Sequence, residues 1–118
     1  MGSAYLLPRV VGLGKATELL LLGDRVDATE AWRIGLATKV VSDDQLDEET
    51  RALATRLASG PSFAYGTTKS LITRELDMDL GSSIELEAMT QALLMKTDDH
   101  AEFYHAFVDK RQPNWRGR

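Results

Sequence analysis

The residue types that most often carry chemistry are few in this sequence. His100 and His105 stand five positions apart near the C-terminus. On a helix this separation turns the two imidazoles to different faces, so they cannot easily share a metal ion. The sequence holds no Gly-rich phosphate loop, no zinc-peptidase pair of histidines and no serine-nucleophile elbow. We therefore interpret both histidines as surface or structural residues and predict no metal site.

Carboxylates are more frequent, and most of them lie where helix N-termini or solvated faces favour negative charge. The close pairs are Asp43/Asp44, Glu48/Glu49, Glu85/Glu87 and Asp98/Asp99. Glu87 differs because it lies near the apolar face of its predicted helix. It is either a functional carboxylate or the ion-pair partner of an arginine such as Arg9 or Arg111. These patterns assign no catalytic residue.

Composition limits the classes of protein to consider. The chain has 118 residues, 43% hydrophobic and 27% charged, which predicts one small globular domain over residues 1–118. A net charge of −4 argues against a nucleic-acid partner. The absence of cysteine excludes disulfides and a thiolate nucleophile. The longest apolar run, Leu19–Leu22, is too short to span a membrane, and no signal-peptide pattern opens the chain. We expect a cytoplasmic protein.

Glycine, proline and capping residues divide the chain into helices. We expect five or six helices and at most one short strand, near Lys39–Val41, where two β-branched residues follow each other. Capping-box spacing begins helices at Asp27 and Ser42, Thr97 can cap the last helix, and Gly23 can end an early one. A short helical turn is expected over 3–11. The expected helices are 15–22, 27–35, 42–60, 63–76, 83–96 and a last helix ending before Pro113, with a connection over 77–81.

Two patterns near the C-terminus allow a structural and a functional interpretation. Met89, Met95, Phe103 and Phe107 recur at helical spacing, which favours a core or a subunit interface over a ligand box. Lys110-Arg111 is a weak phosphate-binding signal, since cations are also favoured at a helix C-terminus by its dipole.

Three blocks, in this order and spacing, resemble the second half of the enoyl-CoA hydratase/isomerase, or crotonase, superfamily. The blocks are Leu7-Pro8-Arg9 with Gly12 and Ala16–Gly23; Asp27-Ala28 with Glu30-Ala31, Gly35-Leu36 and Val40-Val41; and Lys69 with Phe107–Arg111 and Pro113. The family's fold is a spiral of β-β-α repeats followed by a helical region that mediates trimer formation. The resemblance therefore implies a mainly α chain, the C-terminal helical trimerisation region of a crotonase-like fold, with the spiral core absent.

The resemblance also implies a function. Family members bind acyl-CoA thioesters, hold the thioester oxygen with two backbone N–H groups as the enolate forms, and move protons with nearby acids. Those donors and acids are expected upstream of Gly2, so the chain alone is predicted to be inactive. Gly2 and Ser3 match a turn beside the acyl pocket. Phe107 and Lys110 match positions that approach the CoA adenine and phosphates. No cofactor is expected beyond the CoA thioester substrate.

Two hypotheses follow. In the first, the chain is the C-terminal part of a hydratase/isomerase-like enzyme and supplies an oligomer interface, of a trimer or hexamer, and part of the CoA site. In the second, it is a stand-alone, non-catalytic helical assembly module. Without the spiral, the apolar faces of helices 15–22, 42–60 and 83–96 would lack their usual partner, which predicts self-association, a partner chain or poor solubility.

Overall fold

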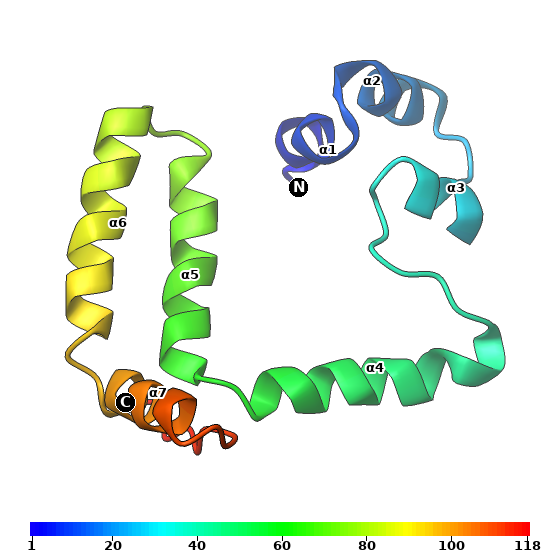
Figure 1. Ribbon diagram of the computed structural model, residues 1–118. Helices are drawn as coiled ribbons and strands as arrows, with labels where there is room; N and C mark the ends of the chain where they lie inside the picture. Colours follow the sequence, from blue (N-terminus) through cyan, green and yellow to red (C-terminus); the bar gives the residue numbers. More distant parts are fainter. The chain divides into compact units, whose positions relative to one another are not determined.

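The computed structural model describes all residues, 1–118, as seven helices without a strand (Figure 1). The helices are α1 (Ser3–Val11), α2 (Leu13–Leu22), α3 (Ala28–Arg33), α4 (Asp43–Ala58), α5 (Ser62–Glu75), α6 (Leu80–Leu94) and α7 (Asp98–Val108). The strand expected at Lys39–Val41 is not formed. A strand needs a neighbouring strand to take up its N–H and C=O groups, and the structure has no second strand that could pair with it. The chain divides into two compact units, 1–47 and 48–118.

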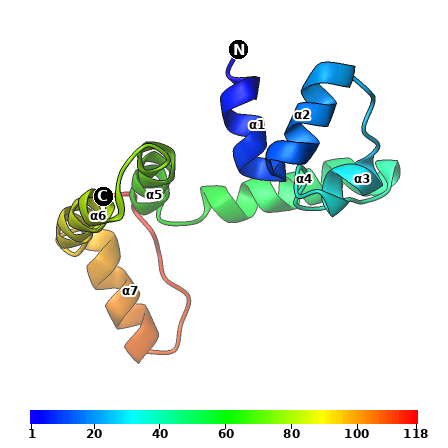
Figure 2. The ribbon, with the colours of Figure 1, turned by 90° about the horizontal axis from the view of Figure 1, so that it is seen from above.

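The first unit begins with α1 and α2, which lie side by side (Figures 1 and 2). Gly12 separates them with a φ of 81°. Helix α2 begins at Leu13, two residues earlier than expected, because the Gly12 carbonyl already accepts the N–H of Ala16, 3.0 Å away. Gly23 ends α2 in the left-handed conformation, as predicted, and its N–H donates to the Leu19 carbonyl.

Helix α3 confirms one half of the predicted capping box. The Asp27 carboxylate accepts the N–H of Glu30 at 2.8 Å. The Glu30 side chain does not return to Asp27, however, because it binds Arg33 on its own helix and lies 3.4 Å from Lys15 of α2. The helix ends at Arg33, where the carbonyl of Ala31 takes up later N–H groups, so it is shorter than the expected 27–35.

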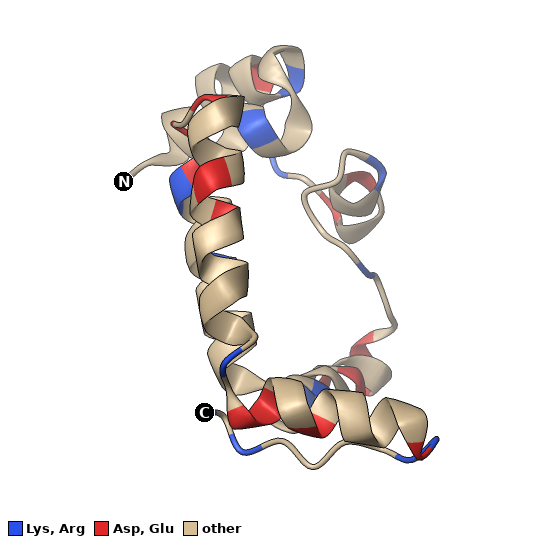
Figure 3. Cartoon of the chain, turned by 60° about the vertical axis from the view of Figure 1, so that its left-hand side comes forward, with Lys and Arg blue, Asp and Glu red and all other residues tan.

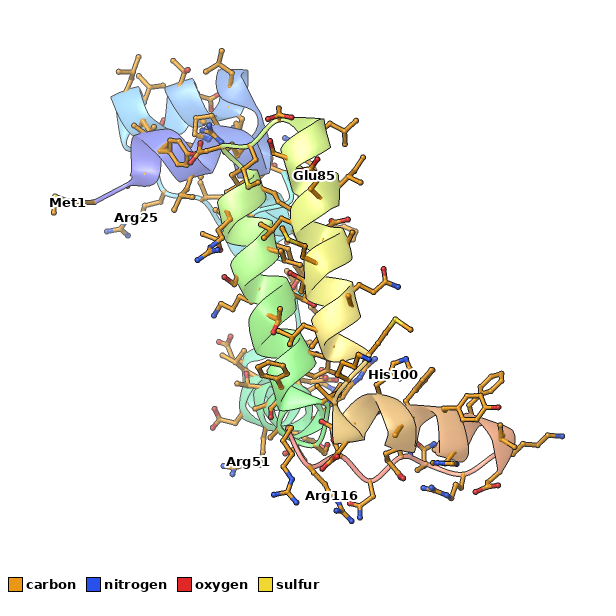
Figure 4. The ribbon with its side chains drawn as sticks, turned by 90° about the vertical axis from the view of Figure 1, so that its left-hand side faces the viewer. Met1, Arg25, Arg51, Glu85, His100 and Arg116 are labelled. Atoms are coloured by element: carbon orange, nitrogen blue, oxygen red, sulfur yellow. The ribbon has the colours of Figure 1, made fainter.

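In the second unit, α5 and α6 form an antiparallel hairpin (Figures 1 and 4). Helix α6 begins at Leu80, three residues earlier than predicted. Its cap is Asp79, whose carboxylate accepts the N–H of Ser82 at 3.0 Å and its hydroxyl at 2.6 Å. The last two residues of the expected 77–81 connection are therefore helical.

Helix α7 begins where Thr97 predicts it: the Thr97 hydroxyl oxygen accepts the N–H of His100. The residues after α7 turn back along the helix, so that the C-terminus returns toward its beginning (Figure 2). None of the helices reaches the length and hydrophobicity that a membrane span requires.

Very little apolar surface is buried within the chain. Ala16 and Ala106 are the only buried hydrophobic residues. The stripe expected on α4 is exposed, with Leu46, Leu53 and Leu57 each more than half accessible. Such extensive apolar surface is unusual for a soluble monomer and is typical of faces that another protein segment covers.

Candidate functional site at the end of α7

Helix α7 ends in a Schellman turn. The N–H of Arg111 donates to the carbonyl of Ala106 at 3.0 Å, and the N–H of Lys110 donates to the carbonyl of Phe107 at 3.3 Å. Lys110 is the left-handed residue of this turn, with a φ of 53°. It is the only non-glycine residue of positive φ in the chain. Glycine is the usual residue at this place, because it has no Cβ to clash with the following carbonyl.

This turn brings two predicted ligand-contacting residues together. Phe107 is 74% exposed, and its carbonyl receives the Lys110 N–H. Lys110 is also exposed and makes no ion pair. An aromatic ring and an unpaired ammonium group therefore stand at one helix end. This combination can stack against a planar ring and attract an anionic group.

The turn is fastened by Arg111 and Glu102. The Arg111 guanidinium meets the Glu102 carboxylate with both prongs, Nη1 to Oε1 at 2.5 Å and Nη2 to Oε2 at 3.0 Å. The backbone N–H of Asn114 adds a third hydrogen bond to Oε1 at 2.7 Å. The Arg111 guanidinium, followed by the Asn114 N–H, lowers the pKa of Glu102 to about 2.

A second carboxylate clamps the tail to the start of α7. Asp99 is only 6% exposed. Its two oxygens accept the N–H groups of Arg116 at 2.6 Å and Gly117 at 2.9 Å, and its own N–H donates to the Arg118 carbonyl. Trp115 stacks on Phe103, with ring centroids 6.5 Å apart. Figure 4 shows Arg116 on this returning tail. Asp99 therefore does more than the helix-terminus charge predicted for it.

An apolar pocket of about 450 Å³ lies within the second unit, where α5 begins, α6 ends and α7 begins. It is lined by Pro61, Phe63, Ala64, Tyr65, Leu94, Thr97, Asp99, His100, Phe103 and Trp115. His105 instead lines a smaller, more polar pocket on α7. The two histidines thus lie in different surroundings, and no cluster of histidine and acidic residues that could hold a metal ion is present.

The aromatic and methionine stripe is not a core of this chain. Met89, Met95, Phe103 and Phe107 are each more than half exposed. The interface alternative for these residues remains a prediction.

Gly2 and Ser3, the other predicted site residues, belong to the first unit. Gly2 is the N-cap of α1 with a φ of 97°, and its carbonyl accepts the N–H groups of Tyr5 and Leu6. Ser3 is the first residue of the helix and is exposed. The two candidate regions are thus a helix beginning in one unit and a helix end in the other.

The sequence model of the enoyl-CoA hydratase/isomerase family matches residues 1–118, the whole chain. The chain belongs to this family. Among curated relatives, the 1,2-epoxyphenylacetyl-CoA isomerase of Escherichia coli is 35% identical over 117 residues, which are 99% of this chain and 45% of that protein. The crotonyl-CoA hydratase of Syntrophomonas wolfei is 35% identical over 114 residues, 97% of this chain and 44% of that protein.

Solved structures agree with this family membership. A provisionally assigned enoyl-CoA hydratase from Streptomyces coelicolor superposes with a TM-score of 0.96 at 58% identity, covering 99% of this chain and 42% of that chain. This member of the enoyl-CoA hydratase/isomerase family therefore spans a little under half the length of the relatives it matches.

The sequence did not reveal one further feature of this family member, a pair of facing carboxylates on α5 and α6. One carboxyl oxygen of Glu75 is buried without a hydrogen-bond partner. Burial, and secondly the Glu87 carboxylate, raise the pKa of Glu75. The prediction that Arg111 could pair with Glu87 is wrong, because Arg111 binds Glu102. One sequence signal could have indicated that Glu75 faces inward. It follows Leu71 by four residues, which places both on the same face of α5, and Leu71 is half-buried.

Proposed function

We propose that this chain is the C-terminal helical part of an acyl-CoA-processing enzyme of the hydratase/isomerase type. The intact enzyme would add water across a 2,3 double bond of a CoA thioester or move that bond. The chain's part is to supply the oligomer interface, of a trimer or hexamer, and one wall of the CoA site. The observation that carries this proposal is a chain matched over its whole length by the family, yet burying only two of its own hydrophobic residues.

The absence of strands favours the helical region of the family's fold over its β-β-α spiral. All seven elements are helices. A substrate of the CoA thioester class is supported by the names of the relatives, a crotonyl-CoA hydratase and an epoxyphenylacetyl-CoA isomerase. The oxyanion-hole donors and catalytic acids are expected in the rest of the enzyme, so we assign no catalytic residue here.

The exposed apolar faces support the interface role. A stable protein interface buries roughly 800 Å² on each partner, and each square ångström of apolar surface removed from water contributes about 25 cal/mol. The leucine stripe of α4 and the exposed Ile84, Met89 and Leu93 of α6 offer surface of this kind. The acidic and basic residues of the chain are coloured in Figure 3. On α4 the carboxylates lie in the first half of the helix, and Leu53 and Leu57 lie beyond them, beside Arg51 and Arg56.

The end of α7 supports a role in CoA binding. Lys110 carries an unneutralised point charge suited to a phosphate, and the exposed ring of Phe107 can stack on adenine. Gly2 and Ser3 would line the acyl pocket at the beginning of α1. The proposed reaction uses the CoA thioester as its substrate and requires no further cofactor.

Light scattering combined with circular dichroism on the purified chain tests the interface role. We expect a discrete oligomer with a helical spectrum, and a chain that stays monomeric at every concentration measured would contradict the interface role. Leu53→Lys places a charge in the apolar stripe and should shift the oligomer toward monomer, whereas Arg51→Lys on the same helix keeps the charge already present and should not. The chain alone should not hydrate crotonyl-CoA, and heat-labile turnover would contradict the assignment of the catalytic groups elsewhere.

A further inference from the structure

Lys110 occupies a backbone conformation that its side chain does not favour. Among all residues of positive φ, the other five are glycines. A glycine at this position would complete the same Schellman turn without steric conflict. Lys110 therefore occupies a position at which the backbone conformation favours glycine, so a role for the lysine side chain would explain why glycine is not used.

The contacts around the turn keep that side chain free. Arg111 engages Glu102 with two hydrogen bonds, and its Nε also lies 3.6 Å from the Asp109 carboxylate. The carboxylates of Glu102 and Asp109 therefore both contact Arg111. The Lys110 ammonium forms no ion pair with either of them, and its charge stays available to a ligand.

The same contacts fix the direction of the turn. Glu102 stands on α7 itself, and its carboxylate receives the side chain of Arg111 and the backbone N–H of Asn114. The residues on both sides of the reversal, the helix before Lys110 and the tail after it, are joined through this one carboxylate. A rigid turn loses little conformational entropy when its lysine meets an anion.

We propose that Glu102 is a positioning residue: through Arg111 it holds the left-handed turn that presents Lys110 to the phosphates of the CoA nucleotide. This inference rests on the proposed CoA site at Phe107 and Lys110. It assigns to Glu102 an effect on phosphate affinity although its own charge repels phosphate.

The test is an NMR titration of the 118-residue chain with adenosine 3′,5′-bisphosphate, using adenosine as the ligand without phosphates. We expect shifts at the Phe107 and Lys110 amides. Glu102→Gln should weaken binding of the bisphosphate about three- to fivefold, the size expected for one exposed charge contact, and leave adenosine binding unchanged. Simple electrostatics predicts the opposite sign, because removing a negative charge favours an anion.

Matched variants separate positioning from misfolding. Glu85→Gln makes the same charge change on α6, where Figure 4 labels Glu85, and should not weaken binding. Arg111→Lys keeps the charge but loses the two-pronged contact, and should reproduce the loss. In a Lys110→Ala background, Glu102→Gln should have no further effect, because the two residues act on the same contact.

The outcomes distinguish a failure of the proposed CoA contact from a failure of the positioning role of Glu102. If the unaltered chain does not bind the bisphosphate at Phe107 and Lys110, the proposed CoA contact is overturned and this inference with it. If the unaltered chain binds, but Glu102→Gln and Arg111→Lys bind equally well or more tightly with helical spectra unchanged, only the positioning role is overturned.

Discussion

Arg111 and Glu102, nine residues apart in sequence, face each other across the end of α7 with two parallel hydrogen bonds. The pair closes a turn in which Lys110 takes the position normally given to glycine. Planar bidentate contacts of this kind define direction as well as distance. The turn is therefore a structured feature, although it lies at the surface and near the end of the chain.

Replacing Lys110 with glycine should separate stability from binding. We expect Lys110→Gly to raise the free energy of unfolding by about 0.5–1 kcal/mol, because the left-handed conformation ceases to be strained. Urea denaturation followed by circular dichroism measures this change. Binding of adenosine 3′,5′-bisphosphate should weaken at the same time, so the two properties move in opposite directions.

The reciprocal control is Gly23, which ends α2 with a φ of 69°. Gly23→Ala should lower the free energy of unfolding by about 1 kcal/mol, since alanine there is forced into the left-handed region. If Lys110→Gly is destabilising while Gly23→Ala behaves as expected, Lys110 contributes to stability through a contact of its own, and the argument from strain is wrong.

The N-cap of α7 offers a second prediction. Thr97→Ala removes the oxygen that accepts the His100 N–H and should destabilise the protein by about 1 kcal/mol. Thr97→Ser keeps the hydroxyl and should change stability by much less. Thermal unfolding followed at 222 nm measures both variants, and equal melting temperatures for the two would show that the cap is not formed in solution.

Local chemistry explains which features could be read from the sequence. The caps at Asp27 and Thr97 and the glycine stop at Gly23 were predicted because each depends on residues within one turn. The same rule applied to Asp79 would have begun α6 correctly, but the glycine that follows at Gly81 suggested a connection instead.

Long-range contacts explain what could not be read. The Asp99 clamp joins residues 17 and 18 positions apart, and no periodic pattern connects an extended tail to a helix start. The burial of Glu75 depends on the neighbouring α6, and the strand expected at Lys39–Val41 depended on a partner strand that this chain does not contain. The pairing of Lys110 with Phe107 at one helix end was implied by the family resemblance, whereas the turn that unites them was not.

Asp99 should control the docking of the tail. Asp99→Ala removes the acceptor of two backbone N–H groups and should weaken tail docking by about 1–3 kcal/mol. Trp115 reports the change, because it would leave Phe103 and become more accessible to acrylamide. A Trp32→Phe background makes Trp115 the only tryptophan.

The control for the clamp is Asp98, whose exposed carboxylate lies 3.3 Å from Arg118. Asp98→Ala should leave the quenching of Trp115 nearly unchanged, because an exposed ion pair contributes little. Equal quenching in the Asp99 and Asp98 variants would mean that the backbone contacts of Asp99 do not hold the tail.

The facing carboxylates on α5 and α6 predict an unusual pH dependence. The pKa of Glu75 is raised above its ordinary value of 4.5, first by burial and then by Glu87. Between 4.5 and the raised pKa the folded chain binds more protons than the unfolded chain, so stability falls as the pH rises through this window. Glu75→Gln mimics the protonated form and should raise the melting temperature at pH 7 while flattening its decline above pH 4.5.

Other carboxylates act in a different pH range, which isolates the contribution of Glu75. Ion pairing lowers the pKa of Glu30 and Glu102 to about 2, so the stability they contribute is present above 4.5 and is lost as the pH falls toward 2. Melting curves of Glu75→Gln and the control Glu85→Gln should therefore differ above pH 4.5 and run parallel below it. Identical curves above pH 4.5 would mean that Glu75 is solvated in solution and that α5 and α6 do not bury its carboxylate.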